Sequence, residues 1–379
     1  MNRKQSWNIV TIFLLLIFGF AVASLLKPDG EFSENENRSL AQRPAFTWEK
    51  LLSGTFSQEY EEYLTDQFLL RDQWIGLKTQ VERLTFRQEI NDIYFAEDDY
   101  LIEKHTGTFE TDQAQANITF LASFFKQLSE TYDSSHLTVM VVPNAVDILR
   151  DKLPSFASPY DEENYLAQIQ AALPAGVWFD ASSVLRQHSD EPVYYRTDHH
   201  WKTLGAFYSF RQWAEDKMLG QVQEKDYTIE TVTDSFEGTI ASKVGTKVVP
   251  DTIELYLPKE EVPYLLTYNR SDDVRSSVYQ MQALDTKDKY GVYYGGNYGL
   301  VEASMQSDTG RRLLVIKDSY AHCFVPFTMQ LFDEVDMLDL RYFNQSLSEY
   351  MEEGAYTDIL FLYNASGFAE DTSLAKLLM

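Results

Sequence analysis

The sequence predicts an α/β protein built on a parallel β-sheet. Largely apolar runs, without the polar alternation of a half-exposed strand, occur at 137–142, 313–316 and 358–363. Stretches with helical spacing of apolar residues precede or separate these runs, at 112–132, 161–173 and 201–219. Short strands that are buried on both faces and separated by helices are typical of a parallel sheet with helices on both sides. A further short strand is expected at 177–179.

The composition fits a globular protein that does not bind nucleic acid. The chain has 379 residues, of which 44% are hydrophobic, so it is long enough for a substantial core. The formal charge of −26 would repel the phosphates of nucleic acid and an anionic membrane surface. Cys323 is the single cysteine, which excludes a disulfide within the chain and a metal site made of several cysteines.

The N-terminal residues predict a membrane anchor. Arg3 and Lys4 precede an uncharged apolar run at 9–26. As a helix this run would span about 27 Å, close to the roughly 30 Å thickness of the bilayer hydrocarbon. Basic residues remain on the cytoplasmic side, so the rest of the chain is expected outside the cytoplasm. The alternative is a signal peptide cleaved near 21–23, which would release the protein; we favour the anchor because the run is long for a signal peptide.

Three regions follow from these patterns. Residues 1–26 form the anchor or signal, and residues 27–90 form a juxtamembrane linker and a helical stalk. The stalk is expected because apolar residues recur at helical spacing, among them Leu51, Phe56 and Tyr60. Residues 91–379 form the main α/β domain, and its rhythm is interrupted by a β-rich insertion at about 227–310.

Polar clusters follow three of the expected strands. They are Pro143-Asn144, Lys317-Asp318-Ser319 and Asn364-Ala365-Ser366. In an open α/β sheet, ligands bind beyond the carboxyl ends of the strands. If the strands are parallel, the three clusters lie at one edge of the sheet.

Ser319 is a candidate nucleophile. It stands where a strand should turn into a helix that starts near Tyr320, so its hydroxyl would be exposed. The free N–H groups and the dipole of a helix N-terminus favour the oxyanion that forms when serine attacks an acyl carbon. The alternative is that Ser319 only caps the helix, which is a common role of serine.

The segment Thr197-Asp198-His199-His200-Trp201 could supply the base. A serine nucleophile needs a histidine, and a carboxylate must fix the orientation of that histidine. Asp198 can reach His200 if the chain bends tightly between them, and His200 is then expected within about 3 Å of Ser319. His199 becomes a spacer, Asp198 could alternatively cap the following helix, and His322 is the rival base.

Metal chemistry is the competing interpretation of this segment. Asp198, His199 and His200 are possible ligands, but no second histidine or carboxylate motif completes a first coordination shell, so we expect no metal and no cofactor. An oxyanion site also needs a second donor. Candidates are Asn144, Asn364, and Gly296 with Asn297, where glycine would let the backbone approach the substrate; an ordinary turn is the alternative at 295–297.

Several segments together resemble the bacterial DHHW family. They are TDHHW (197–201), GGN (295–297), LLVIKDSYAHCFVPF (313–327) and DLRYF (339–343), with ENRSLAQRP (36–44), DQFLLRD (66–72) and VVPNAVDILRDKLP (141–154) in support. That family is similar to the SGNH hydrolase-like domains of alginate O-acetyltransferases. The resemblance implies a three-layer α/β/α SGNH-like fold and a triad in which Ser319 is the nucleophile, His200 the base and Asp198 the orienting acid. The order of the triad is permuted relative to ordinary SGNH enzymes, and Lys317 stands where many relatives have glycine.

The resemblance also implies a function. Relatives with this arrangement act on polysaccharides outside the membrane, often with a membrane-bound O-acyltransferase that passes acyl groups across the bilayer. We therefore expect an anchored, extracytoplasmic O-acetyltransferase of an exopolysaccharide or cell-wall glycan. Two alternatives remain open, namely an acetylesterase with the same triad and a non-catalytic glycan-binding or scaffold protein.

Overall fold

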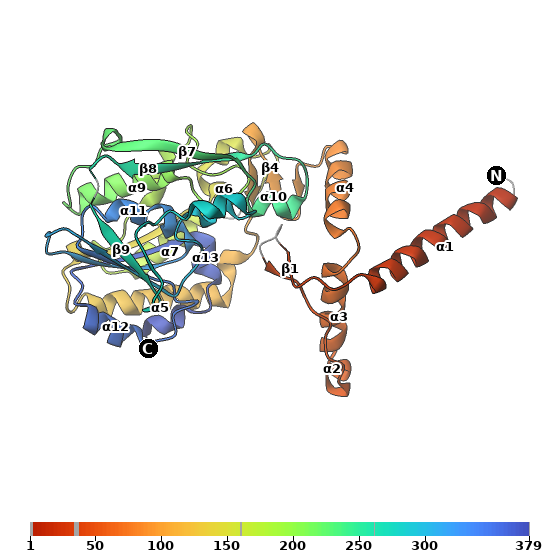
Figure 1. The fold of residues 1–379 in the computed structure, drawn as a ribbon, viewed down its shortest axis with the longest axis horizontal. Helices are drawn as coiled ribbons and strands as arrows, with labels where there is room; N and C mark the ends of the chain where they lie inside the picture. Colours follow the sequence, from red (N-terminus) through yellow and green to blue (C-terminus); the bar gives the residue numbers. More distant parts are fainter. Residues whose placement is uncertain (1–2, 34–37, 160, 261, 379) are drawn as a thin grey trace. The chain divides into compact units, whose positions relative to one another are not determined.

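The computed structural model describes residues 3–33, 38–159, 161–260 and 262–378 (Figure 1). The first two residues of the expected anchor and the start of the linker motif, at 36–37, lie outside these ranges. The chain forms two compact units, one of residues 1–87 with 242–247 and one of residues 88–241 with 248–379. The domain boundaries expected at 26 and 90 stay predictions.

The smaller unit is helical. Its elements are α1 (Arg3–Leu26), α2 (Trp48–Ser53), α3 (Thr55–Asp66), α4 (Arg71–Leu84) and the short antiparallel pair β1 (Phe32–Ser33) and β2 (Arg38–Ser39). Helix α1 is long and apolar enough over Trp7–Ser24 to cross a membrane, as a signal sequence also would be. Side chains at the end of α3 hold the linker, because Ala41 N donates to Asp66 Oδ2 (2.8 Å) and Gly30 N donates to Gln67 Oε1 (2.8 Å).

The larger unit is built on a seven-stranded sheet in the order β10-β9-β11-β13-β12-β14-β6. Its strands are β6 (Leu137–Val142), β9 (Tyr264–Tyr268), β10 (Val274–Arg275), β11 (Leu300–Met305), β12 (Arg312–Lys317), β13 (Glu334–Leu338) and β14 (Asp358–Asn364). The four strands from β13 to β6 are parallel, whereas β11, β9 and β10 pair antiparallel.

The expectation of a purely parallel sheet is therefore wrong, and the sheet is mixed. The reason lies in the connections. β9 and β10 are joined by a turn in which Asn269 and Arg270 adopt positive φ, and such a short link allows only antiparallel pairing. β11 and β12 lie on either side of β13 and are joined only by residues 306–311. This link is too short for the helical crossover that would let β11 run in the direction of β12 and β13, so β11 pairs antiparallel with β13.

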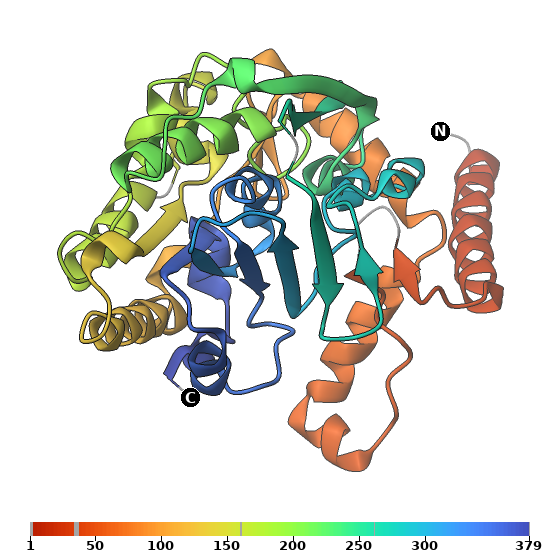
Figure 2. The same ribbon diagram turned by 60° about the vertical axis from the view of Figure 1, so that its left-hand side comes forward.

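Helices cover both faces of the sheet and give the expected three layers (Figures 1 and 2). One core cluster packs residues of α8 (Ala181–Arg186), α9 (Thr203–Asp216) and α11 (Val325–Thr328) on the sheet; the other contains residues of α5 (Asp112–Leu128), α7 (Glu162–Ala172), α12 (Leu347–Gly354) and α13 (Ala365–Glu370). Successive residues of β6 belong to opposite clusters, as the pleat requires: Val139 to one and Met140 to the other. The strand expected at 177–179 is only a single bridge between Trp178 and Val139.

The segment at 227–310 does not form one separate β-rich body. β7 (Tyr227–Phe236) and β8 (Asp251–Pro258) make their own antiparallel ribbon, and α10 (Thr239–Val244) lies between them in sequence. The later strands of the segment, β9, β10 and β11, extend the central sheet. The remaining elements include α6 (Ala145–Ile148) and a small sheet of β3 (Glu89–Ile90), β4 (Ile93–Phe95) and β5 (Leu101–Glu103).

Asn117 provides a test of this packing. Its side chain is buried on α5, and its Nδ2 donates to the carbonyls of Phe368 (2.7 Å) and Asp371 (2.9 Å) around the end of α13. Asn117→Ala would leave these carbonyls without this donor, so the free energy of unfolding in urea should fall by about 1–3 kcal/mol. Gln115→Ala, at an exposed position of the same helix, is the control and should change it little. Equal stability of the two variants would contradict this account of the packing.

Candidate active site

The three strand-end clusters meet at one edge of the sheet, as expected, because β12, β14 and β6 are parallel neighbours. Asn364 at the end of β14 donates to Asp318 Oδ2 through its backbone N (2.8 Å) and its Nδ2 (2.6 Å). Asn144 Nδ2 donates to Asn364 Oδ1 (3.3 Å), and Ser366 N donates to Asn144 Oδ1 (3.0 Å). Asn144, Asn364 and Ser366 thus form a network beneath the segment that carries Ser319.

Ser319 opens a short 3-10 helix at Ser319–Cys323, where an α-helix was expected. The cap of this helix is Asp318, whose Oδ1 accepts from Tyr320 N at 2.8 Å. The alternative in which Ser319 is the cap is therefore wrong. The serine is partly exposed, and its Oγ is free of the capping bond and lies next to His200.

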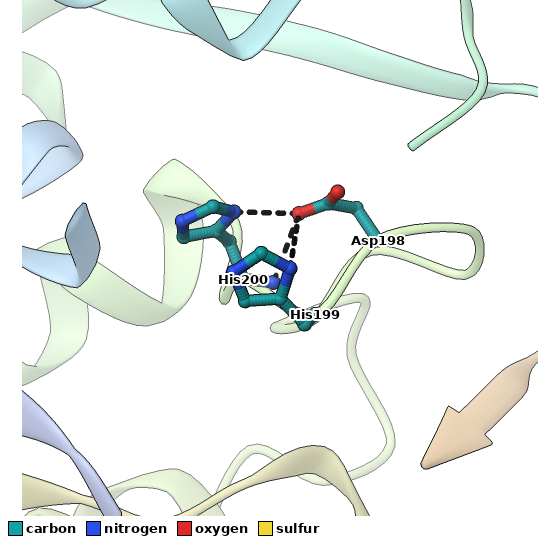
Figure 3. Close-up of side chains that lie close together, drawn as sticks. All are labelled: Asp198, His199 and His200. Carbon is teal, nitrogen blue, oxygen red and sulfur yellow. Dashed lines mark hydrogen bonds and ion pairs between the residues drawn. The ribbon is translucent and has the colours of Figure 1, made fainter. Parts of the chain in front are cut away.

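His200 joins Ser319 to Asp198. His200 Nε2 lies 2.8 Å from Ser319 Oγ, within the expected range, and His200 Nδ1 lies 2.5 Å from Asp198 Oδ1. The backbone N of His200 also donates to Asp198 Oδ1 (3.1 Å), which closes the tight bend seen in Figure 3. Helix α9 is capped by Lys202, so Asp198 does not cap it. The catalytic roles of the three residues stay predictions.

The carboxylate of Asp198 is buried and fully engaged. Its Oδ2 accepts from Thr239 N (2.9 Å) and Thr239 Oγ1 (3.2 Å). Gly238 makes this approach possible, because a Cβ there would lie 2.2 Å from the Cβ of Asp198. Burial raises the pKa of Asp198, but the charges of His199 and His200 and the hydrogen bonds outweigh burial, so the pKa lies well below its usual range. Asp198 therefore stays ionised wherever a histidine titrates.

Aromatic side chains fix the imidazole of His200. The Tyr290 ring stacks on it with a centroid distance of 3.9 Å and an interplanar angle of 14°, and Tyr290 Oη donates to the Ser319 carbonyl (3.2 Å). Trp201 Nε1 donates to the Tyr320 carbonyl (2.9 Å), which ties the histidine loop to the serine turn. Tyr290, Gly238 and Thr239 were not predicted, because no local motif or spacing in the sequence connects them to His200 or Asp198.

The remaining candidates lie elsewhere in the network. His322, the rival base, is buried with its Nε2 2.8 Å from Lys317 Nζ, and burial with the nearby Lys317 charge holds its pKa well below the usual range. Within the described part of the chain, no hydrogen bond connects Gly296 or Asn297 to Ser319 or His200. Their role as oxyanion donors, like that of Asn144, stays a prediction.

Asp198, His199 and His200 also place three potential metal ligands within 4.8 Å of one another. The imidazoles of His199 and His200 lie side by side over the same carboxylate, 3.9 Å apart at their centroids (Figure 3). The near ring nitrogens already have protein partners, since His199 Nδ1 lies 2.9 Å from Thr239 Oγ1 and His200 Nδ1 faces Asp198. These contacts favour a hydrogen-bonded relay over a metal centre.

Comparisons with known proteins give a family match for part of the larger unit. Residues 93–279 match the family described as the SGNH hydrolase-like domain of the acetyltransferase AlgX. This segment contains Asp198 and His200, and Ser319 lies beyond it. A search of curated proteins gave no significant match.

Solved structures share the fold. A DHHW family protein from Eubacterium siraeum has a TM-score of 0.61 and 23% identity, covering 76% of this chain and 95% of its own. PatB1 of Bacillus cereus, solved with a sulfonyl adduct, has a TM-score of 0.58 and 22% identity, covering 74% of this chain and 98% of its own.

The family match supports the class of the protein: an SGNH hydrolase-like enzyme that transfers or hydrolyses acyl groups. More narrowly, residues 93–279 match the SGNH hydrolase-like domain of the AlgX acetyltransferase, and the chain resembles the DHHW family in its fold and in the TDHHW segment itself.

Gly238→Ala tests the support of Asp198. The added methyl group must displace the carboxylate, and a shift of about 1 Å in a catalytic group can lower turnover about a hundred-fold. We expect a loss of this order in acyl-transfer rate, together with a fall of a few degrees in the thermal unfolding midpoint, since overpacking a buried site costs about 1–3 kcal/mol. Gly291→Ala is the control, since its new carbon meets only Ala283 Cβ, at 3.4 Å. Unchanged activity of Gly238→Ala would show that Asp198 does not need this contact.

Chelation tests the metal alternative. Because the site is built as a hydrogen-bonded relay, dialysis of the purified protein against EDTA should leave its acyl-transfer rate unchanged. A loss of activity that is restored by added Zn²⁺ would instead assign Asp198, His199 and His200 to a metal. The EDTA-treated sample, returned to buffer without metal, serves as the reference.

Proposed function

We propose that this protein is a membrane-anchored, extracytoplasmic O-acetyltransferase that acts on an exopolysaccharide or cell-wall glycan. One observation carries the proposal: His200 lies between the hydroxyl of Ser319 (2.8 Å) and the ionised carboxylate of Asp198 (2.5 Å). This is the arrangement that activates serine for acyl transfer. The match of residues 93–279 to an acetyltransferase domain supports acetyl as the group that is transferred.

The reaction would proceed through an acetyl-enzyme. Ser319 Oγ attacks the carbonyl carbon of the donor while its proton passes to His200 Nε2. The bond to the donor's leaving group then breaks, and that group takes the proton from His200. In the second half, a sugar hydroxyl gives its proton to His200 and attacks the acetyl carbon. The Ser319 ester bond breaks, Ser319 regains the proton, and the acetylated glycan leaves.

Asp198 would stabilise the imidazolium that forms in each half of the reaction. Its low pKa keeps the negative charge in place, and the short contact to Nδ1 fixes the tautomer that leaves Nε2 facing Ser319. Tyr290, stacked on the His200 ring, would limit rotation of the imidazole.

The Ser319 backbone N–H is the first proposed oxyanion donor, since it has no hydrogen-bond acceptor among the described residues. The neighbouring N–H of Tyr320 is occupied by Asp318. Asn144, or Gly296 with Asn297, would supply the second donor, because a tetrahedral oxyanion is normally held by two or more hydrogen bonds.

The cellular setting follows from α1. An apolar helix with no buried residue in its Trp7–Ser24 stretch, preceded by Arg3 and Lys4, supports a single membrane span with the larger unit outside the cytoplasm. Acetyl groups are not free in that compartment in activated form. We therefore infer a membrane-bound O-acyltransferase as the partner that delivers them.

Ser319→Ala and His200→Ala test the proposal. Supplied with an activated acetyl donor and an oligosaccharide acceptor, each variant should lose on the order of a thousand-fold or more in acetylated product at unchanged protein level. His136→Ala and Ser123→Ala, which change the same residue types outside the site, should remain active.

The products separate the alternatives. Acetylated oligosaccharide from the unaltered protein identifies a transferase, whereas free acetate alone identifies an esterase. Full activity of both triad variants would exclude the triad. If Ser319 also failed to react with a serine-directed phosphonate, a glycan-binding or scaffold role would be the better description.

A further inference from the structure

Helix α4 has two unlike faces. One face packs within its own unit against residues 242–247: Thr79 Oγ1 donates to the Val244 carbonyl (2.7 Å), and Gly76 lies so close that a Cβ there would be 2.4 Å from the Gly245 carbonyl oxygen. This face needs a small residue and a hydroxyl, and the sequence supplies both. The helix is thus held firmly on one side.

The other face of α4 is an apolar stripe that is largely exposed among the described residues. Trp74, Leu77, Val81 and Leu84 follow one another at spacings of three and four residues and are 44%, 50%, 52% and 79% exposed. Residues at this spacing lie on one side of a helix. An exposed stripe of this size on one helix marks an interaction surface, because scattered single apolar residues are the norm on soluble proteins.

The stripe is continuous with the end of the membrane-spanning stretch. A cavity of about 660 Å³ is lined both by Ala21 and Ser24 of α1 and by Leu64, Phe68 and Trp74. The ring of Phe20 on α1 also meets Trp74 edge to face, with a centroid distance of 5.7 Å. If the Trp7–Ser24 stretch spans the bilayer, side chains that share a cavity with its last turn lie at the level of the membrane surface.

We propose that α4 lies in the interfacial layer of the outer leaflet, with its apolar stripe in the lipid. The stripe would contact lipid at the boundary between the phospholipid headgroups and the acyl chains. This inference rests on the membrane anchoring included in the proposed function. It adds a second, in-plane membrane contact to the single spanning helix.

The side chains around the stripe fit this environment. Tryptophan is favoured at membrane interfaces, and Trp74 occupies the end of the stripe next to α1. Lys78 flanks the stripe on the same helix, where a long basic side chain can reach headgroup phosphates while its stem covers apolar surface. Binding would rely on apolar burial, because the net charge of −26 disfavours attraction to an anionic bilayer.

Depth-dependent fluorescence quenching tests the proposal on the full chain. Leu77→Cys carries an environment-sensitive label on the stripe, Arg83→Cys carries it on another face of α4, and Leu15→Cys carries it in the spanning stretch. The native Cys323 is buried, and burial raises its pKa to about 12, so it should not compete for the label. The proteins are reconstituted in phosphatidylcholine vesicles that contain nitroxide lipids of shallow or deep placement.

We expect the label at position 77 to be quenched several-fold more strongly by the shallow nitroxide than the label at 83. The label at 15 should respond most to the deep nitroxide. Quenching at 15 with equal, weak quenching at 77 and 83 would overturn the interfacial helix alone and leave a protein partner as the occupant of the stripe. Absence of quenching at all three positions would overturn the membrane anchor and, with it, this inference.

Discussion

The buried carboxylate of Asp198 is the constraint on which the site depends. A buried charge is costly unless positive groups and hydrogen bonds surround it, and here both oxygens are occupied by His200 and Thr239. The loop that presents it is held by a second buried carboxylate, Asp251, which accepts from the backbone N of Arg196 (3.0 Å) and of Thr197 (2.8 Å). The positions of Asp198 and His200 are thus fixed by the hydrogen bonds of Thr239 and Asp251 to this loop.

The segment after residue 226 supplies the residues that hold the histidine loop. Asp251 opens β8, and Thr239 opens α10, the helix between β7 and β8, so the ribbon outside the main sheet supplies both contacts to the histidine loop. On the other side, Asp318 fixes the serine turn through Asn364 of β14. Serine and histidine are therefore positioned by independent frameworks, which Trp201 joins through its bond to the Tyr320 carbonyl.

The elements that could be predicted from the sequence are those with a local signal. The strands β6, β12 and β14 are continuous apolar runs, and the polar residues at their ends, Asn144, Asp318 and Asn364, meet because neighbouring parallel strands end together. The antiparallel half of the sheet was missed because strand direction depends on connection length, which composition does not reveal. Tyr290 and Gly238 were missed because their roles arise from contacts with residues about 90 and 40 positions away along the chain. Lys317 was conspicuous in sequence, but its burial between His322 and Asp339 became apparent only in three dimensions.

The place of β14 in the sheet has a consequence for biogenesis. This strand lies between β12 and β6, so neither of those neighbours can pair with the other, and the turn at Asp318 lacks its Asn364 donors until residues 358–364 arrive. A chain exported from its N-terminus emerges with Asp198 and His200 first and this strand last among the described ones. If the larger unit is exported as proposed, the contact between Ser319 and His200 would form only when nearly all of the given chain has crossed the bilayer. Such late, long-range closure also slows folding, since distant segments must meet before the sheet is complete.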